Sequence, residues 1–267
     1  MASIAFAQGQ GEFLMLRSCF DDSGTHADSR VVVWGGLIGN TEAFSVLEYL
    51  WEQFLREPAE GKPSIKKFSA RDCRRGRGEF DGWEEGARDR ARKIARDIIV
   101  KSQLVPVCYA VPLDDFNRII RGRVRRAFGD ANAIAFAACA DTAMKLAKKR
   151  NEAMACVFDA GQETPFLTEL LADNIKRAKD MSVPISHTFQ AVADSYGLQA
   201  ADTIATEHYW YTLNSIQTGS AEPEPHMRAL LRDTDPFGYV MVRADMENLR
   251  DRYRKQFPLW RYFGRKR

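Results

Sequence analysis

Two kinds of hydrophobic spacing divide the chain into strand-like and helix-like segments. Short, nearly continuous apolar runs rich in β-branched residues are typical of strands. Five such runs cover residues 14–20, 31–38, 104–111, 153–158 and 185–190. Apolar residues that recur every three or four positions predict helices. This spacing covers residues 41–55, 79–101, 114–128, 131–149, 164–179 and 197–211, while 65–69 fits either a short strand or a loop.

The order of these segments predicts a mixed sheet. The first two strands are separated only by the loop from Asp22 to Arg30, which favours a hairpin, whereas later strands alternate with helices. We therefore expect an α/β fold, a mixed five-stranded sheet flanked by helices and carrying helical insertions. Pro106 in the third strand cannot donate a ladder hydrogen bond, which favours an edge or bulged position.

No repeat or linker interrupts the pattern, so we expect a single domain over residues 1–267. Residues 1–13 would be an N-terminal extension, and residues 215–267 a C-terminal extension that is helical, basic and aromatic. A content of 45% hydrophobic and 28% charged residues is that of an ordinary globular protein, and it excludes a mainly disordered or fibrous chain.

Cysteine usage and hydropathy suggest the cellular location. The five cysteines are widely spaced without a CxxC pair, which argues against a disulfide framework or a zinc ribbon and favours reduced thiols. No apolar run approaches the roughly 18–20 residues of a membrane span. The N-terminus has no basic segment before its short apolar patch, so we do not expect a signal peptide. The sequence thus predicts a cytoplasmic protein without membrane association.

Three acidic residues occupy positions suited to chemistry. Asp21 closes the first predicted strand, Asp159 closes the fourth, and Asp202 lies inside the last strong helix. Two ionised carboxylates about 4 Å apart repel by about 4 kcal/mol at an effective dielectric near 20, so a cluster needs a cation or a proton. Oxygen ligands suit Mg²⁺ or Mn²⁺. Two such ions could hold the attacking and leaving oxygens of a phosphodiester displacement.

Each acid also has a plainer interpretation. Asp21 and Asp22 precede Ser23-Gly24 and would serve equally well as turn residues. Asp159 precedes Ala-Gly and could also belong to a cap or turn, and Asp202 could face solvent. Asp194 lies just before the last helix and is better placed as its N-cap than as a ligand.

Three short motifs resemble those of a known family. The segments CFDDSG at 19–24, VFDAGQE at 157–163 and ADSYGLQAADTIA at 193–205 occur in the order found in the domain-of-unknown-function 3800 family. That bacterial and phage family is generally predicted to have a ribonuclease H-like fold. The resemblance therefore implies a five-stranded sheet whose first three strands are antiparallel, with carboxylates on the first strand, the fourth strand and a late helix.

The resemblance also assigns residues to roles. It implies that Asp21, Asp159 and Asp202 are catalytic metal ligands. The accessory candidates are Asp22, Glu163, Asp194 and Gln199, the last with a positioning role. The sequence departs from the family at two points: Asp22 stands where Glu is usual, and Ser69 stands where a His is expected, although Asp72 could still contribute an acid there.

Basic residues are clustered, although the net charge is only +3. The two arginine clusters lie at 71–77 and 118–126, and either could contact a phosphate backbone or remain solvated. The candidate nucleic-acid-binding residues are Arg71, Arg74, Arg75, Arg121, Arg123 and Arg125. Residues 252–267 combine seven basic residues with five aromatics. These aromatics could stack on bases, pack against the core or support a homodimer.

The sequence therefore predicts a metal-dependent phosphodiesterase, and specifically a nuclease, that uses Mg²⁺ or Mn²⁺. DNA, RNA and hybrid substrates are all compatible with it. The alternative is a non-catalytic nucleic-acid-binding or protein-interaction module on the same fold, with a host-defence role as a further variant.

Overall fold

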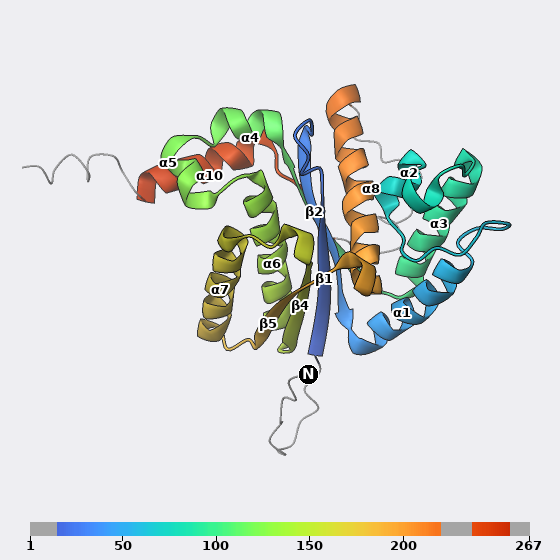
Figure 1. Ribbon diagram of the computed structural model, residues 1–267. Helices are drawn as coiled ribbons and strands as arrows, with labels where there is room; N and C mark the ends of the chain where they lie inside the picture. The colour runs from blue at the N-terminus through green and yellow to red at the C-terminus, as the bar shows by residue number, and fades with distance from the viewer. Residues whose placement is uncertain (1–14, 220–236, 257–267) are drawn as a thin grey trace, which may run out of the picture.

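The computed structural model describes residues 15–219 and 237–256, whose strands form one six-stranded sheet (Figure 1). The strands are β1 Met15–Ser23, β2 Val31–Asn40, β3 Val105–Pro112, β4 Ala153–Asp159, β5 Ile185–Gln190 and β6 Phe237–Val240. Their order in the sheet is β5-β4-β1-β2-β3-β6. β2 is antiparallel to both of its neighbours, β1 and β3, whereas β4 is parallel to β1 and β5 is parallel to β4. This arrangement confirms the hairpin, the mixed sheet and the antiparallel first three strands.

The sixth strand corrects the expected number of five. β6 runs parallel to β3 and pairs with it over Val107–Ala110. A four-residue strand is too short to produce a periodic signal, which is why the hydrophobic pattern did not reveal it. Pro106 lies opposite Leu37 of β2 and just before the residues of β3 that pair with β6. On the β6 side of β3, the missing backbone N–H of Pro106 therefore leaves no ladder hydrogen bond unmade.

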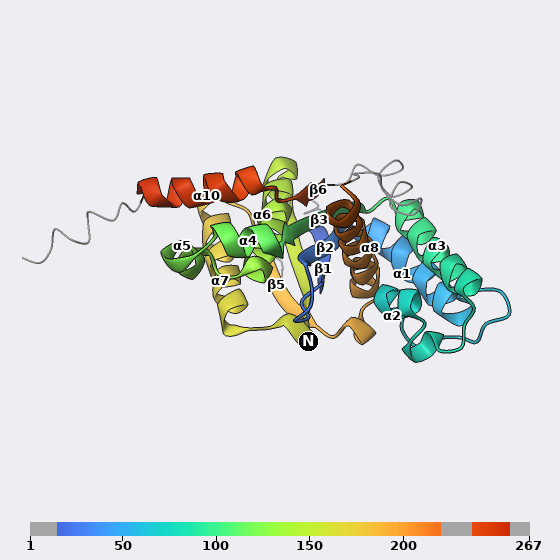
Figure 2. The ribbon, with the colours of Figure 1, turned by 90° about the horizontal axis from the view of Figure 1, so that it is seen from above.

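Helices cover both faces of the sheet. Those described are α1 Thr41–Arg56, α2 Ala70–Arg75, α3 Glu85–Lys101, α4 Leu113–Ile119, α5 Gly122–Phe128, α6 Ala131–Arg150, α7 Pro165–Asp180, α8 Tyr196–Thr218 and α10 Arg243–Gln256. The group α1, α2, α3 and α8 lies on one face, and the group α4 to α7 with α10 lies on the other (Figure 2). None of the described helices is both long enough and apolar enough to cross a bilayer.

Some helix boundaries differ from the periodic pattern. The helix expected over 79–101 begins only at Glu85, because Gly82 adopts a left-handed backbone in the preceding turn. The basic segment 114–128 forms two helices, since Ile120 turns extended and buries its side chain. Residues 65–69 form no strand, and Ser69 instead caps the short helix α2. Within the expected C-terminal extension over 215–267, residues 220–236 and 257–267 lie outside the described residues.

The core has one hydrophobic layer on each side of the sheet. Phe20, Trp34 and Phe158 pack under α6 on one side, and Trp51 and Phe68 belong to the layer under α1, α3 and α8 on the other. Successive side chains of a strand point to opposite faces of the sheet, so alternate residues of each strand contribute to each layer. All five cysteines are buried and free in the described fold.

One glycine sets the distance between α8 and the sheet. A Cβ on Gly35 of β2 would lie 2.6 Å from the backbone of Ala205 in α8. Because Gly35 lacks this atom, α8 lies directly on β2 and carries Asp202, one turn away, toward the end of β1.

Candidate metal centre

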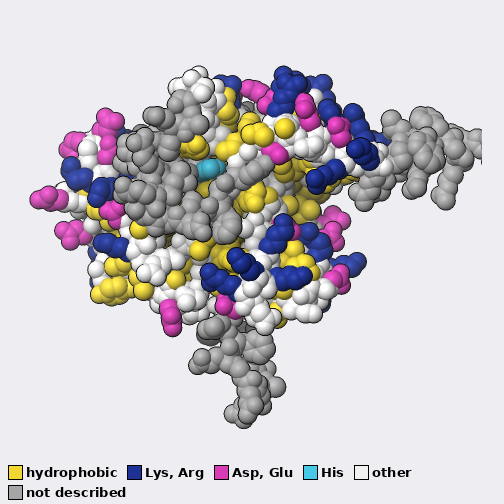
Figure 3. Space-filling view, turned by 180° about the vertical axis from the view of Figure 1, so that it is seen from behind, with side chains coloured by type: hydrophobic (Ala, Val, Ile, Leu, Met, Phe, Trp, Pro, Cys, Tyr) yellow, Lys and Arg dark blue, Asp and Glu magenta, His cyan; other side chains and the backbone are white. Residues whose placement is uncertain are grey.

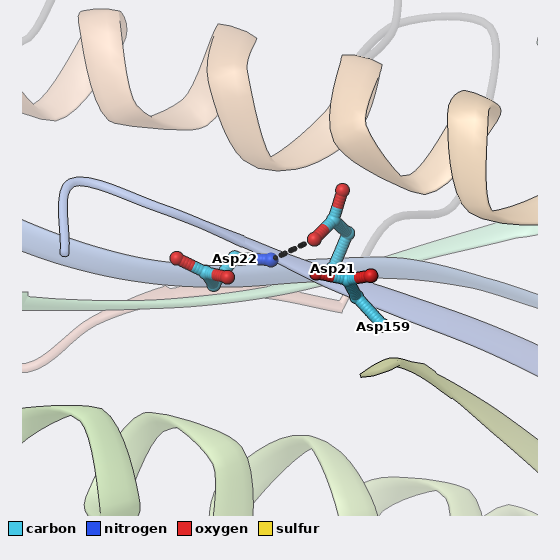
Figure 4. Close-up of side chains that lie close together, drawn as sticks. All are labelled: Asp21, Asp22 and Asp159. Atoms are coloured by element: carbon cyan, nitrogen blue, oxygen red, sulfur yellow. Dashed lines mark hydrogen bonds between the residues drawn. The ribbon is translucent and has the colours of Figure 1, made fainter. Parts of the chain in front are cut away.

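Asp21 and Asp159 meet because their strands are parallel neighbours. Phe20 of β1 is in register with Phe158 of β4, so the next residue of each strand is an aspartate at the same edge of the sheet. Carboxylate oxygens of Asp21, Asp22 and Asp159 all lie within 4.8 Å of one another (Figure 4). Three oxygens at this separation could hold one metal ion.

Asp21 is the most buried member of this group. Its side chain is 6% exposed and points toward α8, and its Oδ1 accepts a hydrogen bond of 2.8 Å from the backbone N–H of Asp22. Burial and then the neighbouring Asp202 charge raise the pKa of Asp21 well above its ordinary value. A buried carboxyl with acidic neighbours is unfavourable as an anion unless a cation compensates it.

Asp22 follows Asp21 in the extended strand, so its side chain leaves the opposite side of β1. Its Oδ2 accepts a hydrogen bond of 2.7 Å from the hydroxyl of Thr25. Burial, opposed by this bond and reinforced by the charge of Asp159, raises the pKa of Asp22 to about 6. Although the side chain of Asp22 is one methylene shorter than that of a glutamate, it still places an oxygen within the group.

Asp202 lines the same cavity from α8 instead of facing open solvent. Its Oδ2 accepts a hydrogen bond of 2.8 Å from the N–H of Ala70, and its Oδ1 accepts one of 3.1 Å from the hydroxyl of Thr206. Burial raises the pKa of Asp202, and the two hydrogen bonds partly oppose that shift. The 4.8 Å group does not include Asp202, whose carboxylate is held across the cavity by these two bonds.

The cavity has a volume of about 210 Å³ and is strongly acidic. Five carboxylates line it: Asp21, Asp22, Asp72, Asp159 and Asp202. Lys67 and Arg71 also line it and are the two cationic side chains among the described residues there. No histidine or cysteine is found among these described lining residues. A donor set made of oxygens fits a hard divalent cation such as Mg²⁺ or Mn²⁺ and does not fit a structural zinc.

Gln199 is fully buried and connects three segments around the cavity. Its Oε1 accepts hydrogen bonds from Trp51 Nε1, at 3.1 Å, and from the N–H of Phe68, at 2.9 Å. Its Nε2 donates to the carbonyl of Val192 at 3.4 Å. Gln199 thus fixes α8 against α1 and against the segment that precedes Ala70.

Two accessory candidates lie away from the cavity. The N-cap of α8 is Ser195, whose Oγ accepts from the N–H of Leu198 at 3.3 Å, so the prediction that Asp194 caps this helix is wrong by one residue. Asp194 instead ends the short 3-10 turn Val192–Asp194 that precedes this cap. Asp194 and Glu163 are both exposed and are not among the lining residues.

Of the six candidate arginines, only Arg71 lines the acidic cavity. Arg75 is exposed on α2, and Arg74 lies over the Trp210 ring at 4.5 Å. The other three belong to the α5 region on the opposite side of the sheet. Arg121 Nε donates to the carbonyl of Asn117, and Arg125 lines a second cavity described below.

A larger basic surface lies elsewhere on the molecule. Lys and Arg side chains, with some acidic ones between them, gather over α5 and α10 in the view from behind (Figure 3). Tyr253 of α10 packs against Phe128 with ring centroids 5.7 Å apart, so this aromatic of the C-terminal segment contacts the fold. Residues 257–267 lie outside the described residues.

Sequence reasoning did not single out Lys67, Thr25 or Gln162, which also line the cavity. Lys67 and Thr25 are exposed and belong to no periodic pattern. Only the approach of three separate segments makes them neighbours of the acids. The motif VFDAGQE contains Gln162, and its spacing from Asp159 was the one available signal.

Comparison with known proteins adds little to this geometry. No family model and no curated protein matches the chain. Among solved structures, a chain of the PCNA:RNase HII complex from Archaeoglobus fulgidus is similar over 82% of this chain and 87% of that chain. The identity is 12% and the TM-score is 0.44.

Proposed function

We propose that this protein is a metal-dependent phosphodiesterase of ribonuclease H-like fold, and that its substrate is a nucleic acid. The observation that carries the proposal is the convergence of acids from β1, β4 and α8 in one cavity. The strand order and the positions of these acids agree with the motif resemblance at 19–24, 157–163 and 193–205. Asp21, Asp159 and Asp202 are the proposed catalytic residues.

The residues of the cavity divide into metal-holding and phosphate-holding groups. Asp21, Asp22 and Asp159 would hold a divalent ion, and Asp202 faces them from α8. When bound, such an ion supplies charge neutralisation and water activation for phosphodiester hydrolysis. Lys67 and Arg71 at the same cavity offer positive charge that orients the phosphate.

Hydrogen bonds within the site keep the carboxylates in place. The Thr25 hydroxyl fixes Asp22, and the Ala70 N–H and Thr206 hydroxyl fix Asp202. The Ser69 hydroxyl accepts from the N–H of Asp72 as the cap of α2 and lacks a histidine neighbour among the described lining residues. This geometry favours water over a serine side chain as the nucleophile.

Cleavage of labelled single-stranded, duplex and hybrid nucleic acids tests the proposal. The wild type should cleave at least one of them with Mg²⁺ or Mn²⁺ and not with EDTA. Asp21→Asn and Asp202→Asn should lower the rate by roughly 100-fold or more, since even groups one step removed from a metal contribute about 10- to 100-fold. Asp81→Asn, an exposed change outside the cavity, is the matched control and should retain the rate.

Two results would contradict the proposal. Cleavage that persists in EDTA or in both cavity variants would show that the carboxylates do not act as proposed. Binding of nucleic acid by a folded wild type without any cleavage would instead favour the non-catalytic module.

A further inference from the structure

A second cavity adjoins the acidic one and is not used by the proposed mechanism. It has a volume of about 390 Å³, within the usual range of small-molecule sites. Gly24, Thr25 and Gln162 line both cavities, so the loop after β1 and the segment after β4 form their common border. A ligand in the second cavity would therefore touch residues that also touch the acids.

The second cavity combines apolar walls with fixed hydrogen-bond donors. Val32, Leu113 and Phe116 supply apolar surface. Asn132 Oδ1 accepts a hydrogen bond of 2.6 Å from Nε1 of the fully buried Trp34. Because the indole N–H can only donate, this bond fixes the amide orientation and leaves the Nδ2 group of Asn132 as a donor.

Arg125 is the cation of this cavity and is held by two contacts. Its Nη1 donates to Asn117 Oδ1 at 2.9 Å, and its guanidinium carbon lies 5.4 Å from the centre of the Phe116 ring. The carboxylate of Asp130 also lines the cavity, but its Oδ1 accepts from the N–H of Ala133 as the cap of α6. The Arg125 guanidinium and the free Asn132 amide group suit a ligand that carries a phosphate and hydrogen-bond acceptors.

We infer that this second cavity binds the nucleotide next to the phosphodiester held at the acidic cavity, with that nucleotide unpaired. The inference rests on the proposed function. The apolar walls suit the face of a base, Asn132 donates to an acceptor on the base edge, and Arg125 contacts the adjacent phosphate. A base that enters a concave site must leave its stack and its pairing partner, so strands that are single at this nucleotide are selected.

The inference is tested by binding in EDTA, which separates it from catalysis. Fluorescence anisotropy would measure the affinity of the full chain for a labelled single-stranded hexanucleotide and for the same strand in a duplex. The single strand should bind more tightly. Arg125→Ala should weaken its binding by roughly 10-fold and reduce the salt dependence by about one phosphate contact, a slope change near 0.7. Arg90→Ala, which changes an exposed arginine of α3 outside the cavity lining, is the control and should change affinity much less.

Asn132→Asp tests the donor without removing the acceptor for Trp34. It should weaken single-strand binding by roughly 10-fold while thermal unfolding stays close to wild type, because an oxygen still faces the indole N–H. Equal affinities of all variants, tighter duplex binding, or equal losses in Arg90→Ala and Arg125→Ala would overturn the inference. Cleavage by the wild type, with binding that does not depend on Arg125 or Asn132, would reject this inference and leave the proposed function intact. Binding that depends on these two residues, without any cleavage by the wild type, would reject the proposed function and leave this inference intact.

Discussion

At the scale of single residues, the acidic cavity places unfavourable charges close together. Asp21 is nearly buried, and it and Asp22 both have a raised pKa because burial and neighbouring carboxylates oppose ionisation. Natural proteins retain such an arrangement where function requires it, at a cost in stability.

Asp21→Asn should stabilise the metal-free protein while it weakens metal binding. The amide has nearly the same shape and can keep an oxygen toward the N–H of Asp22, and it removes a buried charge. We expect the free energy of unfolding in EDTA at pH 8 to rise by on the order of 1 kcal/mol. Urea unfolding measures this change, and a variant less stable than wild type would contradict the charge argument.

The contribution of Asp22 to stability should fall as the pH rises. Its folded pKa of about 6 lies above the ordinary value of 3.8, so between these values the folded state binds more protons than the unfolded state. Stability from this group is therefore full below about pH 4 and is lost progressively up to about pH 6, by at most on the order of 3 kcal/mol.

Urea unfolding of wild type and Asp22→Asn in EDTA at pH 4.5 and pH 7.5 checks this sign. The difference in unfolding free energy, wild type minus variant, should be smaller at pH 7.5 than at pH 4.5. Taking the difference cancels the titration of groups that the two proteins share. A difference that grows with pH would mean that Asp22 is stabilised as an anion in the metal-free protein.

The sequence indicated these residues only in part. Asp21 and Asp159 could be predicted because strand ends place side chains at one edge of a sheet. The hydrogen bonds that hold Asp202 to Ala70 and Thr206 could not be predicted, since Ala70 lies 132 positions away and belongs to a helix without a periodic signal. Asp194 was misplaced because the cap depends on where α8 starts, and helix ends are the least certain part of a periodic pattern.

At the scale of elements, the position of α8 decides whether Asp202 reaches the cavity. Gly35→Ala should push α8 from β2, because the new methyl group would lie 2.6 Å from the backbone of Ala205. We expect a loss of about 1–3 kcal/mol in unfolding free energy and a slower metal-dependent reaction. Gly86→Ala is the control: it lies in α3 with no contact under 3.4 Å and should stabilise by about 0.5–1 kcal/mol. Similar effects of the two changes would contradict the close approach at Gly35.

Gln199 holds α8 from its other side, where it contacts α1 and the segment before α2. Gln199→Ala should lower the unfolding free energy by about 2–4 kcal/mol, because it leaves the buried N–H groups of Trp51 and Phe68 without their acceptor. Gln217→Ala, at an exposed position near the end of the same helix, should change it by less than about 0.5 kcal/mol. Equal losses in chemical denaturation would show that the buried hydrogen bonds contribute little.

Element boundaries show where sequence patterns suffice. The strand Ile185–Gln190 was predicted residue for residue, since a short β-branched run lies between two turns. β6 was missed because four residues carry too little pattern. α2 was missed because its six residues form a helix through the Ser69 cap and the left-handed Gly76, while only two of its side chains are buried.

At the scale of the whole molecule, the acidic cavity lies where β1 and β4 end beneath α8 and α2. The second cavity lies across the loop after β1, toward α4, α5 and α6. The sequence could not place the two together, because their lining residues come from distant segments. The sheet order brings β1 and β4 together, and only then does the loop after β1 become a border shared by both cavities.

The most direct test of the account is whether the acidic cavity binds a divalent ion. Isothermal titration of the full chain with Mn²⁺ and with Mg²⁺ would compare wild type, Asp21→Asn and the exposed control Asp81→Asn. We expect saturable binding by the wild type and the control, and binding at least about 10-fold weaker in Asp21→Asn. Absence of binding by the folded wild type, or equal binding by Asp21→Asn, would contradict the assignment of these carboxylates to a metal centre.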